Sequence, residues 1–227
     1  LVEPDGFADE AALEASRATH LAATRSVFED SDILVFTLGL TEAWRSRHDG
    51  AVFATAPGVN GGSYDPDRYE FVNFGIDEVR DGLFRYCELA RSVNPDIKIL
   101  LTVSPVPLIA TFEPRHVLVS TTASKSILRV AADEAYRRFD FVDYFPSFEI
   151  IQGAHATRNY YAPDLREVED IGEAHVMRCF SRHYVDGLGW QAAPAGSPPP
   201  KAVTDAERSV VCDEETIVAA LDASRQG

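Results

Sequence analysis

Three short runs of apolar residues, each too short for a helix, predict strands in this chain. The first, Ile33 to Leu38, has five apolar residues in six, which is typical of a strand buried on both sides within a parallel sheet. The second, 97–103, ends at two prolines, Pro105 and Pro107, which cannot continue a ladder of strand hydrogen bonds. The third, shorter run covers 141–146.

Apolar residues at helical spacing predict the segments between and around these strands. We expect helices over 8–29, from Asp65–Pro66 to Asn94, after the hydroxyl-rich segment 120–126, and around 171–180. One of the hydroxyls in 120–126 is expected to cap the third helix. The breakers at 57–58 and 60–62 indicate a long loop, in which Val52–Phe53 is a candidate for a small hairpin. A loop is also expected after the third strand.

This alternation of strands and helices predicts an α/β domain with a parallel sheet and right-handed crossovers. Only three strands are evident, whereas a stable doubly wound domain usually has about five. Either the long loops supply strands, or the first strand or strands of the sheet lie upstream of Leu1. We expect the domain to span 1–186. Residues 187–227 have the composition of a Pro/Gly-rich linker and tail with one short helix, 214–223.

Composition narrows the classes of partner. The chain has 227 residues, 45% of them apolar, and a net charge of -15 without any basic stripe, so we expect no nucleic-acid partner. The three cysteines lack CxxC spacing, which argues against a disulfide framework or a zinc site and favours reduced thiols in the cytoplasm. No apolar run approaches the roughly 18 residues of a membrane span. The sequence shows no metal-binding His pairing and no GxGxxG motif, so we expect neither a metal nor a cofactor.

Candidate chemistry follows the strands. In open α/β sheets ligands bind beyond the carboxyl ends of the strands. Gly39, Thr41 and Glu42 follow the first strand and Ser104 follows the second, so these residues are candidates for a binding site. Each also has a structural interpretation, in which Gly39 and Ser104 are turn residues and Glu42 forms a local salt bridge.

Four motifs together resemble the GSCFA domain family, over roughly residues 10–185. They are Thr-Leu-Gly-Leu-Thr-Glu-Ala-Trp at 37–44, Leu-Thr-Val-Ser-Pro-Val-Pro-Leu at 101–108, His-Val-Leu at 116–118 with Ser-Lys-Ser at 124–126, and Asp-Tyr-Phe-Pro-Ser-Phe-Glu at 143–149. That family is similar to the SGNH (GDSL-like) hydrolases. The resemblance implies a flavodoxin-like three-layer α/β/α fold. It also implies ester hydrolysis or acyl transfer, with O-acyl groups of a carbohydrate or small molecule as substrate.

The resemblance also implies site residues, with two departures. SGNH-like enzymes use a serine nucleophile, glycine and asparagine oxyanion donors, and a late Asp-x-x-His pair. The Gly-Ser-Cys-Phe-Ala motif that would carry the serine is absent from this chain, so we expect the nucleophile and its strand upstream. The glycine–asparagine block falls on Gly39 to Glu42, with Thr41 in the asparagine place. The late block falls on Asp164 to Glu167, so a glutamate occupies the histidine place.

Glutamate is a poorer base than histidine at neutral pH, so other residues become candidates for that role. His116 lies in the loop after the second strand, and His175 lies eight residues beyond Glu167, where it shares a helix face if both are helical. Lys125 is a candidate for recognising an acidic substrate group, or is a solvated charge at a helix start. Asp164 is a candidate catalytic residue or a helix cap. The alternative to an enzyme is a non-catalytic carbohydrate- or ligand-binding domain on the same fold, which Glu167 favours.

Overall fold

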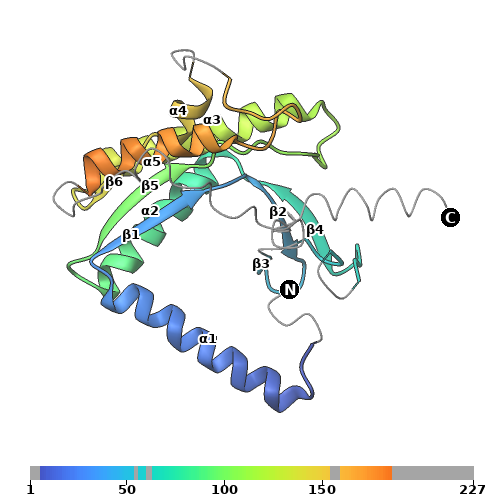
Figure 1. The fold of residues 1–227 in the computed structure, drawn as a ribbon. Coiled ribbons are helices and arrows are strands. Elements are labelled where there is room, and N and C mark those ends of the chain that lie inside the picture. The colour runs from blue at the N-terminus through green and yellow to red at the C-terminus, as the bar shows by residue number, and fades with distance from the viewer. Residues whose placement is uncertain (1–5, 54–55, 60–62, 154–158, 186–227) are drawn as a thin grey trace.

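The computed structural model describes residues 6–53, 56–59, 63–153 and 159–185, which form two small sheets and five helices (Figure 1). The parallel sheet has the order β1 (Ile33–Leu38), β5 (Lys98–Val103), β6 (Val142–Tyr144). The antiparallel sheet has the order β3 (Val52–Phe53), β2 (Glu42–Ser46), β4 (Tyr69–Asn73). The helices are α1 (Glu10–Asp30), α2 (Ile76–Val93), α3 (Val117–Arg138), α4 (Ser147–Gln152) and α5 (Asp170–Tyr184).

The parallel sheet lies between two helical layers. Helices α2 and α3 cover one face, where Cys87 and Ala131 pack with Ile99 and Leu101 of β5 in the main apolar core. Helices α4 and α5 lie on the other face, where Thr102 shares a 2.6 Å hydrogen bond with Ser147. This is a mixed α/β fold consistent with the flavodoxin-like α/β/α architecture, as the sequence predicted.

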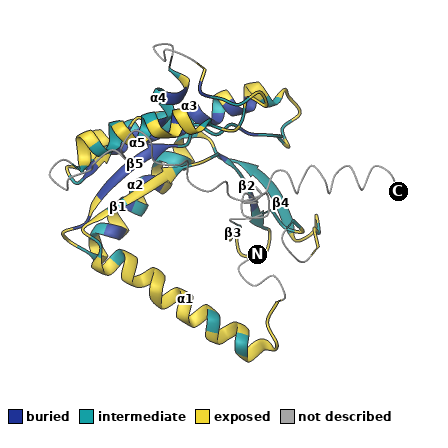
Figure 2. Cartoon of the chain, viewed as in Figure 1, coloured by how far each residue is buried: buried dark blue, intermediate teal, exposed yellow. Residues whose placement is uncertain are grey.

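The prediction that β1 is buried on both faces is wrong. Ile33 and Val35 are 59% and 51% exposed, while Leu34 and Leu38 on the opposite face pack against the core. In the part of the chain that the structure describes, β1 pairs only with β5, so it is an edge strand. Only one face of this apolar strand is therefore covered, and Figure 2 shows β1 mostly as exposed.

The segment after the first strand also differs from the prediction. The helix expected from Asp65–Pro66 begins only at Ile76, because residues 69–73 pair with β2 and form β4 instead. The long loop thus supplies strands, including the expected Val52–Phe53, but they build a separate antiparallel sheet. This second sheet extends from the end of β1, away from α2 (Figure 1).

The helical boundaries carry smaller corrections. The cap of α3 is His116, whose Nδ1 accepts a hydrogen bond from the Leu118 amide, and not a hydroxyl of 120–126. The segment after β6 contains the short helix α4 where a loop was expected. Helix α1 forms as predicted but has no buried residue. The predicted tail, 187–227, lies outside the described residues. None of the helices in the described ranges has an apolar stretch sufficient to cross a bilayer.

Candidate functional site

The carboxyl ends of the three parallel strands meet at one edge of the sheet, here called the rim. Leu38 pairs with Val103 at the end of the β1–β5 ladder, and the Ser104 amide donates to the Leu38 carbonyl at 2.9 Å. The Ser147 hydroxyl, which follows β6, donates to the Val103 carbonyl at 2.9 Å. The loops that follow β1, β5 and β6 are therefore held against one another at the rim.

Helix α3 turns a polar face toward the rim. Ser120, Thr121, Ser124 and Lys125 are buried, whereas Leu118 near the helix start is 66% exposed. These four buried residues form two pairs spaced by four, so they project from the same side of the helix. This inward polar face is the reverse of the usual amphipathic pattern, in which the apolar stripe faces the core. A polar face costs desolvation unless its groups are hydrogen-bonded, and each of the four is.

Two of these side chains fix the segment that follows β1. Lys125 is 2% exposed, and its Nζ donates to the Gly39 carbonyl at 2.8 Å. Ser124 accepts a hydrogen bond of 2.9 Å from the amide of Thr41, which is also 2% exposed. The structure thus brings together Gly39, Thr41 and Lys125, three of the residues that the sequence indicated. The Lys125 side chain is buried and is not a solvated charge at a helix start.

A polar network continues from Thr41 to the loop before α3. The Thr41 hydroxyl donates to Asn73 Oδ1 at 2.7 Å, and Asn73 Nδ2 donates to Glu113 Oε1 at 3.1 Å. Glu42 accepts hydrogen bonds from the Thr111 hydroxyl and from the Phe112 amide, so it fixes the same loop. Among the described residues it has no salt-bridge partner. The only hydroxyl proton of Thr41 is used by Asn73, so an oxyanion role for Thr41 requires that bond to break.

Asn73 and Glu113 were missed by reasoning from the sequence. Asn73 ends β4, a strand that lies where the sequence predicted a helix, and no local pattern marks Glu113. The signal that places Asn73 beside Thr41 is the pairing of Glu42 with Asn73, a contact between segments far apart in the chain. One Nδ2 hydrogen of Asn73 is used by Glu113, and an amide nitrogen carries two.

The two candidate histidines lie apart in different layers. His116 accepts from the Leu118 amide at Nδ1, so its neutral ring carries the proton on Nε2, and the outward nitrogen is a donor instead of a base. His175 Nδ1 shares a 2.7 Å hydrogen bond with the hydroxyl of Tyr160, which is 4% exposed. If Nδ1 carries the proton in that bond, Nε2 is left as a base, so the geometry favours His175 over His116 in this role.

The late block, 164–167, forms a turn before α5. Asp164 Oδ1 accepts from the amides of Arg166 and Glu167, at 2.9 and 3.1 Å, so it stabilises a turn and caps no helix. Leu165, inside this turn, has a φ of 58°. Glu167 precedes α5, which begins at Asp170, so the expectation that it shares a helix face with His175 is wrong.

The loop that carries the late block is joined to the rim by Tyr161. The Tyr161 hydroxyl donates to the Pro105 carbonyl at 2.7 Å, and it accepts from Gln152 at 2.7 Å. Burial raises the pKa of Tyr161, so this phenol stays protonated and keeps donating at neutral pH. The Ser104 hydroxyl, in the same loop after β5, accepts from the Val106 amide at 3.2 Å and serves as a turn residue.

An ion pair beside the rim joins α3 to the family-like motif at 143–149. Arg129 Nε lies 2.5 Å from Glu149 Oε1, and the guanidinium lies over the Tyr144 ring at 4.2 Å. Tyr144 also donates to Glu149, at 2.9 Å to Oε2. Burial, and then the hydrogen bond to Glu149, raise the pKa of Tyr144. These contacts attach α4 to α3 and β6 and give the motif residues a structural role.

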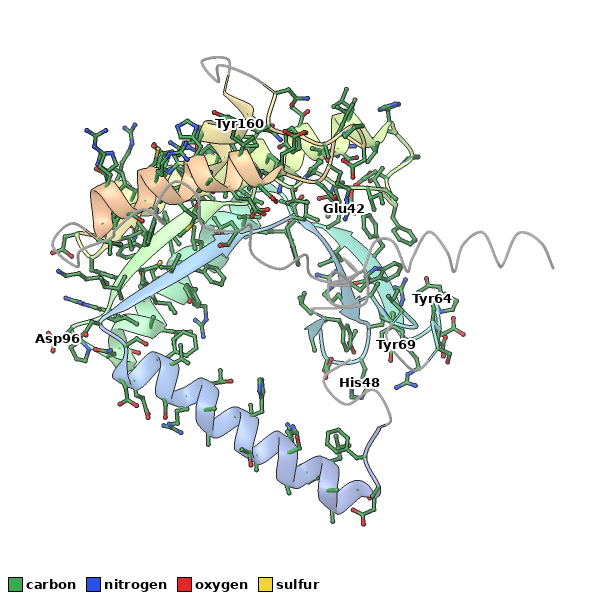
Figure 3. The ribbon with its side chains drawn as sticks, viewed as in Figure 1. Glu42, His48, Tyr64, Tyr69, Asp96 and Tyr160 are labelled. Carbon is green, nitrogen blue, oxygen red and sulfur yellow. The ribbon has the colours of Figure 1, made fainter. Side chains whose placement is uncertain are left out.

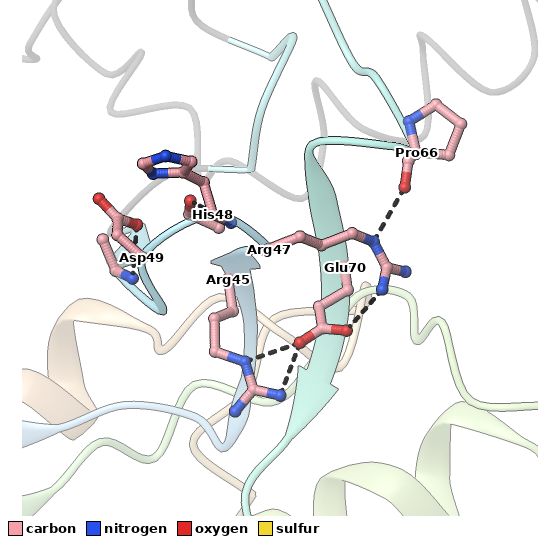
Figure 4. A network of polar contacts seen from close by, with 8 residues as sticks. Arg45, Arg47, His48, Asp49, Pro66 and Glu70 are labelled. Carbon is pink, nitrogen blue, oxygen red and sulfur yellow. Dashed lines mark hydrogen bonds and ion pairs between the residues drawn. The ribbon is translucent and has the colours of Figure 1, made fainter.

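A second ion-pair network lies on the antiparallel sheet, away from the rim (Figure 4). Glu70 of β4 accepts from Arg45 at 2.6 Å and from Arg47 at 2.9 Å. The hydrogen bond from Arg45 is the main cause that lowers the pKa of Glu70. Arg45 and Arg47 are 39% and 50% exposed, so solvent screens these pairs and they contribute little to stability.

The described residues hold the polar groups of a site but no paired nucleophile and base. Over these ranges, neither His116 nor His175 hydrogen-bonds a serine hydroxyl. No group of three or more His, Cys, Asp or Glu side chains in the same ranges is arranged to hold a metal ion. Figure 3 shows Glu42 where β2 begins and Tyr160 in the helical layer beyond the sheet.

Comparison with known proteins gives one match. The sequence model of the GSCFA family matches residues 6–180, which is more than half of the chain. No curated protein and no solved structure matches the chain.

Proposed function

The chain belongs to the GSCFA family, and from this premise we propose that it is an SGNH-like ester hydrolase or acyltransferase with its site at the rim. The substrate in this proposal carries an O-acyl group on a carbohydrate or small molecule. The observation that carries the proposal is the buried side chain of Lys125, whose Nζ donates to the Gly39 carbonyl at 2.8 Å. Acyl transfer develops negative charge on an oxygen, and hydrogen-bond donors held in place in a dry environment stabilise it.

Gly39 supports this placement because it leaves its backbone open to a ligand. Gly39 is exposed, and a Cβ added there would meet no heavy atom within 4 Å. The Lys125 Nζ donates to the Gly39 carbonyl, so Lys125 acts through Gly39 as a positioning residue. The Ser124 hydroxyl holds the next part of the same segment through the Thr41 amide. The arrangement fits a preorganised wall that needs no rearrangement when charge develops.

The proposal assigns the nucleophile to a Gly-Ser-Cys-Phe-Ala motif outside these residues and the base to His175. The hydroxyls of Ser120, Ser124 and Ser147 are bonded to Arg115, Thr41 and Val103 respectively, so each already has a structural partner. His175 is held through Nδ1 by Tyr160, which is the orientation that leaves Nε2 for proton transfer when Tyr160 accepts.

Hydrolysis of p-nitrophenyl acetate tests the proposal. The 227-residue chain is compared with the protein extended upstream to include the Gly-Ser-Cys-Phe-Ala motif. We expect hydrolysis only by the extended protein, with loss of activity when the motif serine is changed to alanine and a large decrease in kcat for His175→Ala. Equal rates for the short chain and the extended protein contradict the nucleophile assignment.

A non-catalytic ligand-binding domain is the second candidate. The observation that favours it is that the Thr41 hydroxyl is already used by Asn73, while Glu167 occupies the place of the family-like histidine. Calorimetry on the extended protein discriminates the two, because saturable binding of an acylated oligosaccharide without release of acid supports a binding domain and contradicts an enzyme.

A further inference from the structure

An aromatic cluster covers one face of the antiparallel sheet. Trp44 of β2 pairs with Phe71 of β4, so both rings project from the same face. The Trp44 ring lies edge-on to Tyr64 and Phe112, with centroid distances of 5.1 and 4.8 Å. Trp44 itself is 8% exposed, and it lies beneath the two other rings and contacts both.

The two flanking rings are open to solvent, unlike the ring between them. Tyr64 is 50% exposed and Phe112 is 43% exposed, and we call these two the ring pair. Gly58 holds the loop that carries Tyr64, because a Cβ at Gly58 would lie 2.9 Å from the Tyr64 amide nitrogen and its φ is +87°. Each ring of the pair is packed edge-to-face against Trp44, a contact that is worth about 0.5–1.5 kcal/mol.

The ring pair is continuous with the polar network of the rim. Glu42 pairs with Asn73 two positions along the same strands, on the same face as the Trp44–Phe71 pair. The Phe112 amide donates to Glu42 at 3.3 Å, and the next residue, Glu113, accepts a hydrogen bond from Asn73. The Trp44–Phe71 pair and the Glu42–Asn73 pair thus share one face of the antiparallel sheet. In Figure 3, Glu42 lies where β2 begins and Tyr64 lies further along this sheet.

We propose that the ring pair, with Asn73 and Glu113, binds the sugar rings of a neutral carbohydrate chain. The C–H face of a pyranose packs on an aromatic ring, and its hydroxyls bond amide and carboxylate groups. Glu113 is bonded through one oxygen, whereas a carboxylate offers about four acceptor sites, so it retains capacity for hydroxyl donors. This inference names the substrate class of the proposed enzyme. It rests on the proposed function only for the reaction that the bound sugar undergoes.

Charge and size favour this occupant over others. The net charge of -15 opposes anionic ligands such as nucleic acid or polyuronates. A stable protein partner covers about 800 Å² on each side, whereas two half-exposed rings offer the area of one or two sugar residues. A neutral oligosaccharide matches both the extent and the chemistry of the surface.

Fluorescence of Trp44 reports directly on this surface. The chain has two tryptophans, Trp44 and Trp190, so in a Trp190→Phe background Trp44 is the single fluorescent reporter. Xylohexaose, cellohexaose, mannohexaose and chitohexaose are titrated in turn. We expect at least one to change the emission saturably, with affinity reduced at least tenfold by Tyr64→Ala or Phe112→Leu. Phe112→Leu keeps an apolar side chain on Trp44, so we expect the variant to stay folded, and an unchanged circular dichroism spectrum checks this.

The matched control removes an exposed ring elsewhere. Tyr136 of α3 is 51% exposed, and Tyr136→Ala is expected to leave the affinity within twofold of the parent. The inference is overturned if none of the four sugars changes the emission or gives a saturation-transfer NMR signal, or if the three variants bind alike. It is also overturned if the ring-pair variants alter the sedimentation coefficient, which indicates self-association at this face. Sugar binding without ester hydrolysis contradicts the proposed enzyme alone, and hydrolysis without sugar binding contradicts this inference alone.

Discussion

The two serines that flank Lys125 provide a matched test of the rim. Ser124 is buried, and its hydroxyl is the acceptor for the amide of Thr41 at 2.9 Å. Ser126 is exposed, and its hydroxyl donates to the Thr122 carbonyl within the same helix. The change from serine to alanine is chemically identical at both positions, so a difference in stability reports the environment alone.

The magnitudes separate the two variants. Ser124→Ala leaves the buried Thr41 amide without an acceptor, and an unsatisfied buried donor costs about 1–3 kcal/mol. Alanine is a better helix former than serine by about 0.5 kcal/mol, a gain that applies to both positions. We therefore expect Ser124→Ala to lower the free energy of unfolding by about 0.5–2.5 kcal/mol. Ser126→Ala is expected to raise it by up to about 0.5 kcal/mol.

Urea unfolding followed by circular dichroism measures both values in the same chain. The expected difference between the variants is about 1–3 kcal/mol, which corresponds to a clear displacement of the midpoint with an unchanged slope. Equal midpoints for the two variants, or a less stable Ser126→Ala, refute the claim that Ser124 holds the segment after β1.

Three further expectations test the packing. Gly172→Ala places a Cβ 2.9 Å from the Tyr160 side chain and should lower the melting temperature, whereas Gly82→Ala meets no atom within 4 Å and should stabilise α2 by about 0.5–1 kcal/mol. Burial raises the pKa of Cys87 from 9.0 to about 11, so the native thiol should resist Ellman's reagent at pH 8 until urea unfolds the chain. Because the folded state favours the neutral thiol, its contribution to stability is present below pH 9 and is lost as the pH rises toward 11; a flat profile over that window argues against burial of Cys87. Val35 and Leu100 are register partners on one face of the parallel sheet, but only Val35 is exposed. Val35→Lys should change the free energy of unfolding by less than about 0.5 kcal/mol, whereas Leu100→Lys should lower it by more than about 3 kcal/mol. Similar losses for the two variants contradict the open face of β1.

The elements of the parallel sheet could be predicted because their signals are local. The runs around Leu34, Leu101 and Val142 are apolar over a strand's length, and each is bounded by breakers or polar residues. Their exposure could not be predicted, since the number of neighbours a strand has is a property of the whole sheet. The same apolar pattern describes β5, buried on both faces, and β1, covered on one.

The site could be predicted only in part, for a similar reason. Gly39, Thr41 and Ser104 were indicated by their places at strand ends, which is a local rule. The segment 65–75 was misjudged, because its helix-start signal at Pro66 was overridden by pairing of residues 69–73 with β2. That error concealed Asn73. The burial of Lys125 could not be predicted, because the polar side of α3 faces inward. The reason for that orientation is the bond from Lys125 to the Gly39 carbonyl, which only the fold reveals.

The most direct measurement of the central claim is the rate of ester hydrolysis after the Lys125 amino group is removed. In the extended protein that carries the Gly-Ser-Cys-Phe-Ala motif, Lys125→Met is compared with Lys98→Met, which removes an exposed ammonium at the start of β5. We predict that Lys125→Met lowers kcat by about 10²-fold or more with KM little changed, as expected for lost stabilisation of a developing oxyanion. Lys98→Met should stay within twofold of the parent. Equal kcat values for the two variants, both folded, contradict a catalytic rim around Lys125.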